Sequence, residues 1–228
     1  MSMRVPFLAD EKIESAAHEL LMKFSKATGK AVTPPIPVDD IIEKYLRVRL
    51  EICDLKAKLR TPDVLGAAYF EENIIRVDES LEAQEGRLCF TMAHEAGHWQ
   101  LHRPLYEMDK VSAPLFGPNE PAPTFLCRSS QRPPAEIQAD KFAAKLLMPT
   151  RFVREAFSFI SSNGPALVEG LDSRRTDPSV VNRWSDIARA VITKGDFSNV
   201  SVEAMRYRLT DLSLVLDKDA ASAQRRLL

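Results

Sequence analysis

The segment HEAGH at residues 94–98 constrains this chain more than any other feature of its sequence. We predict that it lies on a long helix, where residues four apart share one face, about one turn from each other. Two imidazoles at that spacing, those of His94 and His98, can bind one metal ion, and zinc is well suited to them. Glu95 projects from the same side, where it can reach a metal-bound water without being a ligand. The motif therefore predicts two metal ligands and a general base.

A catalytic zinc site needs a third protein ligand, and His102 is the nearest candidate. Eight residues of helix, however, rise about 12 Å and turn away from the direction of His94. The glycine that breaks such a helix in some zinc proteases is replaced here by Leu101. We therefore exclude His102 as a ligand and place it beside the ligands or at the helix end.

A second predicted helix, over residues 135–148, offers a better ligand. Glu136 lies in its first turn, and Asp140 points the same way one turn later. Asp140 could then accept the free ring N–H of a ligating histidine and fix its orientation. The alternative is that the helix dipole alone favours an acidic residue at this end. Because the histidine pair lacks a third ligand, we favour ligation by Glu136.

These two segments together resemble the ImmA/IrrE family of metallo-endopeptidases. The match rests on FTMAHEAGHWQLH (90–102) and EIQADKFAAKLLMP (136–149), and it extends more loosely over residues 36–149. The resemblance implies a minimal thermolysin-like zincin core, with zinc bound by His94, His98 and Glu136 and with Glu95 as the catalytic glutamate. It also implies a regulatory protease whose protein substrate is a helix-turn-helix transcriptional repressor, often encoded by a neighbouring gene. Asp140 stands where many members of the family carry Asn or Asp.

The rest of the pattern predicts an α+β fold. Two helices (11–27 and 39–45) and three strands (47–53, 66–70 and 74–77) precede the helix that carries the motif. We expect a small, mostly antiparallel sheet packed on the motif helix and on the second ligand-bearing helix. A metallopeptidase domain would then cover residues 1–157, and a helical C-terminal region would cover residues 158–228.

A proline-rich connection, residues 103–134, separates the two halves of the predicted site. We expect it to lack regular structure and to act as a lid or binding loop, or to be disordered. Cys127 within it could reach the metal as a fourth, inhibitory ligand, although an ordinary loop cysteine is the simpler interpretation. The chemistry also needs a donor for the oxyanion, and Tyr106, His102 and Arg128 are candidates that the sequence does not separate.

Residues 196–216 are similar to half of a helix-turn-helix, read as a short helix, a turn capped by Ser201 and a second helix. Arg206 and Arg208 are predicted to lie on the outer face of that helix. Two arginines are thin support for DNA binding, so we favour a packing or docking role for this region.

Global composition excludes several functional classes. With 31 basic and 32 acidic residues, the formal net charge is −1, which is not typical of a nucleic-acid or membrane-surface binder. No apolar run has the length of a membrane span, and the three cysteines lack a CxxC pair, so we expect a soluble, cytoplasmic protein.

We expect Zn²⁺ as the cofactor, although Mn²⁺ or Fe²⁺ could use the same ligands. The main alternative to a protease is a zinc-containing protein that binds a regulator without cutting it, as a toxin–antitoxin-type component would. Glu95 separates the two, because a structural zinc site closes with four protein ligands and needs no base.

Overall fold

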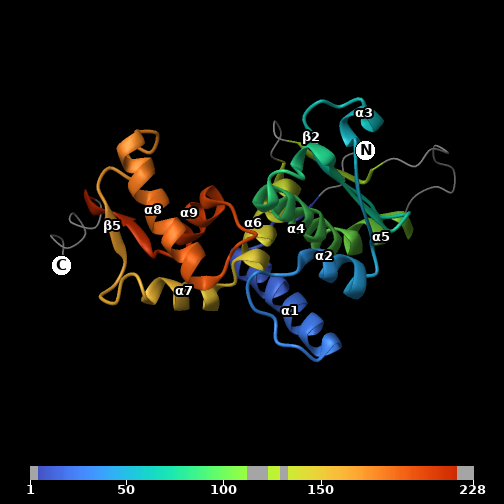
Figure 1. Ribbon diagram of the computed structural model, residues 1–228. Coiled ribbons are helices and arrows are strands. Elements are labelled where there is room, and N and C mark those ends of the chain that lie inside the picture. The colour runs from blue at the N-terminus through green and yellow to red at the C-terminus, as the bar shows by residue number, and fades with distance from the viewer. Residues whose placement is uncertain (1–4, 112–122, 129–132, 220–228) are drawn as a thin grey trace. The chain divides into compact units, whose positions relative to one another are not determined.

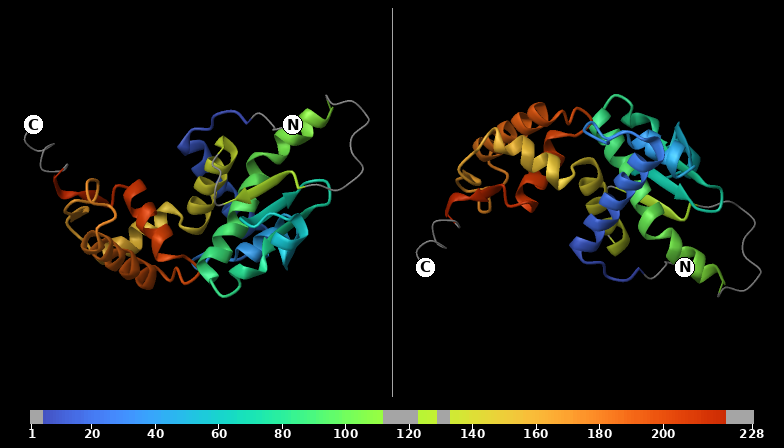
Figure 2. Two further views of the ribbon diagram at one scale, coloured as in Figure 1. Left: turned by 90° about the horizontal axis from the view of Figure 1, so that it is seen from above. Right: turned by 90° about the horizontal axis from the view of Figure 1, so that it is seen from below.

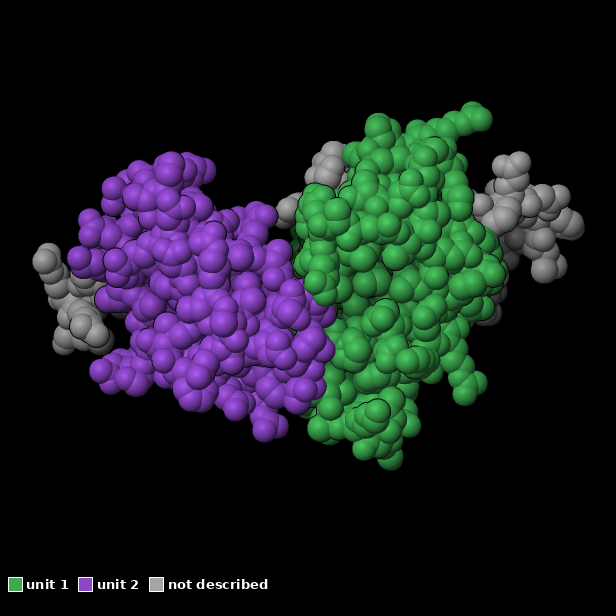
Figure 3. All heavy atoms as spheres, in the orientation of Figure 1, with its two compact units in different colours: residues 1–32, 36–147 green, residues 33–35, 148–228 purple. Residues whose placement is uncertain are grey.

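The computed structural model describes residues 5–111, 123–128 and 133–219 (Figure 1). The chain divides into two compact units, one made of residues 1–32 and 36–147 and the other of residues 33–35 and 148–228 (Figure 3). Among the described residues, no helix has both the length and the apolar character needed to cross a membrane.

The first unit begins with α1 (Asp10–Thr28), close to the helix predicted for residues 11–27. Its buried residues recur every three or four positions, and Gly29 ends it in the left-handed conformation at φ 68°. The next predicted helix is only partly regular. It consists of α2 (Val38–Asp40) followed by one π-helical segment, Ile41–Tyr45.

A four-stranded sheet in the order β1-β3-β2-β4 forms the other layer of this unit. Three of the strands match the predicted ones: β1 (Arg49–Cys53), β2 (Val64–Tyr69) and β3 (Ile74–Asp78). β1 pairs with β3 in parallel, whereas β2 is antiparallel to both β3 and β4 (Phe125–Arg128). The expected hairpin between β2 and β3 turns at Asn73, which has a φ of 54°. The α+β class is therefore confirmed.

Two short helices beside the sheet were not predicted. These are α3 (Leu55–Leu59) and the 3₁₀ turn Glu79–Leu81. Asp54 caps α3, and the buried Asp78 accepts hydrogen bonds from the backbone N–H groups of Leu55 and Lys56 and from the Lys56 ammonium. These contacts lower the pKa of Asp78 to about 2 despite its burial. Asp78 thereby fixes α3 to the end of β3.

Helices stack in layers on one face of the sheet. α4 (Glu85–Leu101) packs on β2 and β3, α6 (Pro134–Leu147) packs on α4, and α1 packs on α6 (Figures 1 and 2). The apolar face predicted for α6 is buried, with Ala139, Phe142 and Leu146 at zero exposure. The motif helix thus lies between the sheet and the second predicted ligand-bearing helix.

The prediction that residues 103–134 lack regular structure is wrong where these residues are described. α5 (Arg103–Val111) follows α4 directly, and β4 adds the edge strand of the sheet next to β2. Residues 112–122 and 129–132 lie outside the described residues. The four-residue strand escaped prediction because its order comes from pairing with β2, some 60 residues earlier, and not from its own sequence.

The second unit contains α7 (Thr150–Ser158), α8 (Pro178–Gly195) and α9 (Val202–Asp211). It is not purely helical, because β5 (Ala166–Val168) and β6 (Val215–Asp217) form a two-stranded parallel sheet. Ser201 caps α9, as predicted, by accepting a hydrogen bond from the backbone of Ala204. The predicted short helix just before it is absent; residues 197–200 form a turn after α8.

The predicted outward orientation of Arg208 is also wrong. Arg208 is 2% exposed and donates hydrogen bonds to the Met148 carbonyl and the Thr150 hydroxyl. It lies three residues after the buried Met205, so the two residues share the inner face of α9. Arg206 lies over the Trp184 ring, 4.7 Å from its centroid. The two arginines proposed for an outer face therefore have structural contacts inside this unit.

Candidate metal centre

A glycine lets the two ligand-bearing helices approach each other closely. A Cβ atom at Gly97, inside HEAGH, would lie 3.1 Å from Phe142 Cδ1 and 3.2 Å from the Cα of Ala139 on α6. Ordinary carbon–carbon contacts begin at about 3.5 Å, so no larger side chain fits without moving α6. The histidine face of α4 is thereby held against the first turn of α6.

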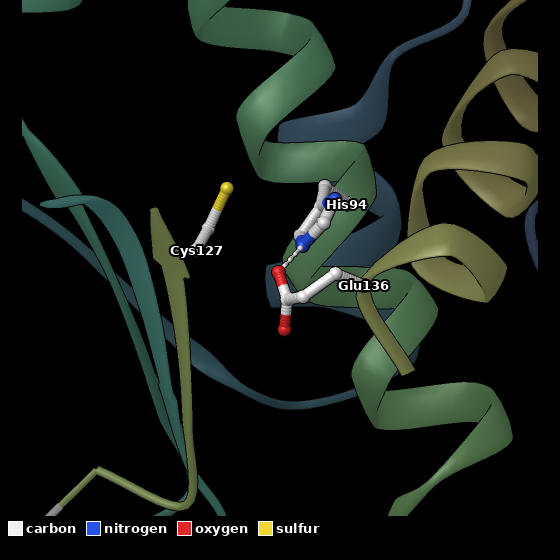
Figure 4. Close-up of side chains that lie close together, drawn as sticks. All are labelled: His94, Cys127 and Glu136. Atoms are coloured by element: carbon white, nitrogen blue, oxygen red, sulfur yellow. Dashed lines mark hydrogen bonds and ion pairs between the residues drawn. The ribbon is translucent and has the colours of Figure 1, made fainter. Parts of the chain in front are cut away.

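Three side chains meet where these helices approach. The two Nε2 atoms of His94 and His98 are 3.0 Å apart. The two carboxylate oxygens of Glu136 lie 3.0 Å from His94 Nε2 and 3.2 Å from His98 Nε2 (Figure 4 shows His94 and Glu136). Adjacent corners of a tetrahedron lie about 1.6 bond lengths apart, or about 3.3 Å for zinc bonds of about 2.0 Å. The three donors therefore have the spacing of one face of a tetrahedral zinc site.

The pKa values of these three groups favour the binding of a cation. Burial alone would raise the pKa of Glu136, but its contacts with the imidazoles of His94 and His98 lower it to about 2. Burial lowers the pKa of His98 to about 3, so this ring is neutral. Burial also disfavours a charge on His94, yet its contacts with Asp140, Cys127 and Glu136 outweigh burial and raise its pKa. Without a metal, an imidazolium at His94 neutralises the ionised Glu136.

Asp140 contacts the other side of the His94 ring. Its Oδ1 atom lies 2.9 Å from His94 Nδ1, one helical turn after Glu136. A carboxylate here holds a proton on Nδ1 and leaves the Nε2 lone pair for a metal. The structure thus brings Asp140 to the position that sequence reasoning gave it.

His102 ends α4 as its C-cap residue, is fully buried, and takes part in a chain of hydrogen bonds. Gln138 donates from Nε2 to the Pro6 carbonyl at 2.8 Å, so its Oε1 atom faces His102 Nε2 at 3.0 Å. His102 must donate to that oxygen, and its Nδ1 atom then accepts from His98 Nδ1 at 2.9 Å. His98 therefore carries its proton on Nδ1 and presents a bare Nε2 to Glu136.

Sequence reasoning missed Gln138. It lies only two residues after Glu136, but the contact that gives it a role joins it to His102, 36 residues earlier in the chain. A helical period does not predict such a contact, because it depends on how α4 and α6 pack. The available signal in the sequence was a polar residue four positions before Phe142 of the apolar face, and in the fold it is 5% exposed.

Glu95 lies in the core beside the predicted metal ligands and against the sheet. It has no exposed surface, and neither carboxylate oxygen has a hydrogen-bond partner among the described residues. A Cβ atom at Gly66 of β2 would lie 2.5 Å from its Oε1 atom, so a larger residue there would displace the Glu95 carboxylate. Burial raises the pKa of Glu95 to about 8, with His94 opposing and Glu136 reinforcing the shift. An unpartnered buried carboxyl of this kind is costly and is typical of functional sites.

Cys127 reaches the centre from β4. Its Sγ atom, one nitrogen of His94 and one oxygen of Glu136 all lie within 4.8 Å of one another (Figure 4). Two sets of three donors therefore share His94 and Glu136, with either His98 or Cys127 as the third. The set with His98 is tighter, with separations of 3.0 to 3.2 Å, so we take it as the primary ligand set. Burial raises the pKa of the Cys127 thiol, although His94 opposes this shift.

Tyr106 and Arg128 were two of the candidate donors to the oxyanion. The Tyr106 hydroxyl donates to the Glu71 carboxylate at the β2–β3 hairpin, and its ring packs edge-on against Phe70. Burial and Glu71 raise the pKa of Tyr106 to about 12. Arg128 ends β4, but its side chain lies outside the described residues.

Two histidines on one helix and a glutamate on a second are the donor set that catalytic zinc sites of some metal-dependent peptidases use. Residues 45–159 match the IrrE N-terminal-like domain of the M78 peptidases, over about half of the 228-residue chain. The chain belongs to this family, so the predicted ImmA/IrrE membership is confirmed and the protein is a metallopeptidase by family. No curated protein matches the chain.

Proposed function

We propose that this protein is a zinc-dependent endopeptidase with a thermolysin-like core. His94, His98 and Glu136 are the proposed zinc ligands, and Glu95 is the proposed general base. The observation that carries the proposal is Glu95 itself, whose two buried carboxylate oxygens have no hydrogen-bond partner in the described part of the chain and lie beside three donors spaced for a metal. Burying such a group without a hydrogen-bond partner costs free energy, and groups of this kind gather at functional sites.

Each side chain has a defined part in peptide hydrolysis. A bound zinc ion would polarise the scissile carbonyl and lower the pKa of the attacking water. Glu95 accepts a proton from that water and delivers it to the leaving amine. Asp140 and the chain from His102 through Gln138 to Pro6 hold the two imidazoles with Nε2 toward the metal. The buried site strengthens these interactions because little water screens them.

The edge of the sheet favours an extended protein substrate. β4 is the edge strand on the side of the metal centre, with β2 as its pairing partner. An unfolded or extended segment can add a strand to such an edge and lie across the ligands. The resemblance to the ImmA/IrrE family further supports a helix-turn-helix repressor, encoded by a neighbouring gene, as the substrate.

A regulator-binding protein that does not cut remains the alternative, and Glu95→Gln separates the two proposals. The test incubates repressors encoded nearby with the zinc-loaded protein and follows fragments by mass spectrometry. Glu85→Gln, at the exposed start of the same helix, is the matched control. We expect fragments with the wild type and with Glu85→Gln, and intact repressor with zinc-bound Glu95→Gln. Cleavage by zinc-bound Glu95→Gln, or repressors left intact by the wild type, would contradict the proposal.

A further inference from the structure

β4 runs along the histidine face of α4. The Phe125 ring stacks on the His98 ring, with centroids 4.3 Å apart and planes 22° from parallel, and it also approaches His102 at 5.3 Å. Phe125 and Cys127 are two residues apart on a strand, so they point to the same side. Two strand residues span about 6.6 Å, and four helix residues rise about 6 Å. The strand spacing therefore places Cys127 at His94 when Phe125 lies on His98.

A local irregularity also directs Cys127. Val64 pairs with Arg128 and Gly66 with Cys127, so Leu65 is an extra residue in β2 at this point. Bulges of this kind re-aim the side chains of the paired strands. The Sγ atom, a His94 nitrogen and a Glu136 oxygen lie within 4.8 Å of one another, so the thiol shares two of its neighbours with the triangle of donors (Figure 4).

We propose that Cys127 is a fourth protein ligand that closes the zinc site in the resting protein. This inference rests on the proposed function, because it takes His94, His98 and Glu136 as the other three ligands. On ligation the S–H bond breaks, its proton passes to solvent, and the sulfur replaces the bound water without any change of oxidation state. A site closed by four protein ligands has no open position for water. The fourth position is therefore open to water only while Cys127 is away from the metal, so cleavage of a bound substrate requires the thiolate to be displaced.

Glu95, which is buried and has no hydrogen-bond partner within residues 5–111, 123–128 and 133–219, is a second and independent observation that favours this position. A carboxylate in that place has nothing to act on unless the fourth position opens to water, so the site must alternate between thiolate and water. The other two cysteines cannot substitute for Cys127. Cys53 lies on β1 at the opposite edge of the sheet, and Cys89 lies in the first half of α4.

Two measurements on the full-length protein test this inference. The first loads the wild type, Cys127→Ser and Cys53→Ser with Co²⁺ and records the near-ultraviolet absorption that arises from sulfur-to-cobalt charge transfer. The second treats the metal-free and Zn²⁺-loaded protein with iodoacetamide and follows the alkylation of each cysteine by peptide mass spectrometry. Cys53 is the internal control, because it is partly exposed and distant along the sheet.

We expect the charge-transfer band in the wild type and in Cys53→Ser and its loss in Cys127→Ser. Zn²⁺ should slow alkylation of Cys127 at least about tenfold and leave Cys53 unchanged, because coordinated sulfur is a poor nucleophile. Metal binding without the band, or alkylation of Cys127 that ignores Zn²⁺, overturns this inference alone. Failure of all three proteins to bind either metal overturns the proposed function with it.

Discussion

Replacing Glu95 with glutamine should change how the stability of the metal-free protein depends on pH. The folded protein raises the pKa of Glu95 from 4.5 to about 8, chiefly through burial. A carboxyl with a raised pKa contributes its full stability below the unfolded pKa and loses it as the pH rises through the folded value. The wild type should therefore become less stable from acidic toward mildly alkaline pH, whereas the glutamine of the Glu95→Gln variant does not titrate.

The magnitude follows from the two pKa values. Where the unfolded carboxyl is ionised and the folded one is not, the free energy of unfolding falls by about 1.4 kcal/mol per pH unit. Between about pH 6 and pH 8, Glu95 should therefore cost the wild type about 2 kcal/mol. The loss needs little reduction for solvent screening, because the side chain has no exposed surface.

The assay is urea denaturation of chelator-treated wild type and Glu95→Gln at both pH values. Trp99 on α4 reports the first unit, and a Trp184→Phe background removes the other tryptophan of the chain. The change in the free energy of unfolding between the two pH values is then compared by subtracting the value for Glu95→Gln from that for the wild type. Contributions from titrating groups that both proteins share largely cancel in this difference. A remaining difference below about 0.5 kcal/mol would show that Glu95 is solvated or paired, and would refute the burial argument.

Three further substitutions test the packing of each part. Gly97→Ala places a methyl group against Phe142. The cost of overpacking, about 1–3 kcal/mol, exceeds the gain in helix propensity. Because α6 must move away from α4, we expect a lower zinc affinity, measured by competition with a chelator. Gln138→Leu removes the acceptor for His102 and should weaken zinc binding about 10- to 100-fold, whereas Gln138→Glu keeps an acceptor. Equal zinc affinities of these two variants would exclude a role for the hydrogen-bond chain. Arg208→Met removes the hydrogen bonds to the Met148 carbonyl and the Thr150 hydroxyl and should destabilise the second unit by about 1–3 kcal/mol, read from Trp184 fluorescence, with zinc affinity unchanged.

The parts of the site that could be predicted are those encoded within one helix. His94, Glu95 and His98 follow from a spacing of four, and Glu136 and Asp140 share a face for the same reason. Each helix carries its own pattern, so the sequence indicated which side chains would face one another even before the packing was known. The helix 10–28 and the β2–β3 hairpin were likewise predictable from local spacing and turn residues.

The parts that escaped prediction depend on contacts between distant segments. β4 is ordered by pairing with β2, and Gln138 acquires its partner only when α6 packs on α4. Gly66 is an ordinary strand glycine until the Glu95 carboxyl is placed against it. Arg208 was misread because an arginine is usually exposed, whereas here a backbone carbonyl and a hydroxyl accept its hydrogen bonds in the core.

The candidate metal centre is held by contacts with more of the chain than the family match covers. The match begins at residue 45, yet the Pro6 carbonyl ends the hydrogen-bond chain that orients His98. Asp10, at the start of α1, accepts from both Lys141 and the buried Lys145 on α6, so α1 holds the helix that carries Glu136. An imidazole that rotates or a carboxylate that shifts by about 1 Å loses its ligand geometry, and both are restrained here by residues before position 45. Pro6 and Asp10 therefore hold, by hydrogen bonds, the residues that orient the proposed ligands His98 and Glu136.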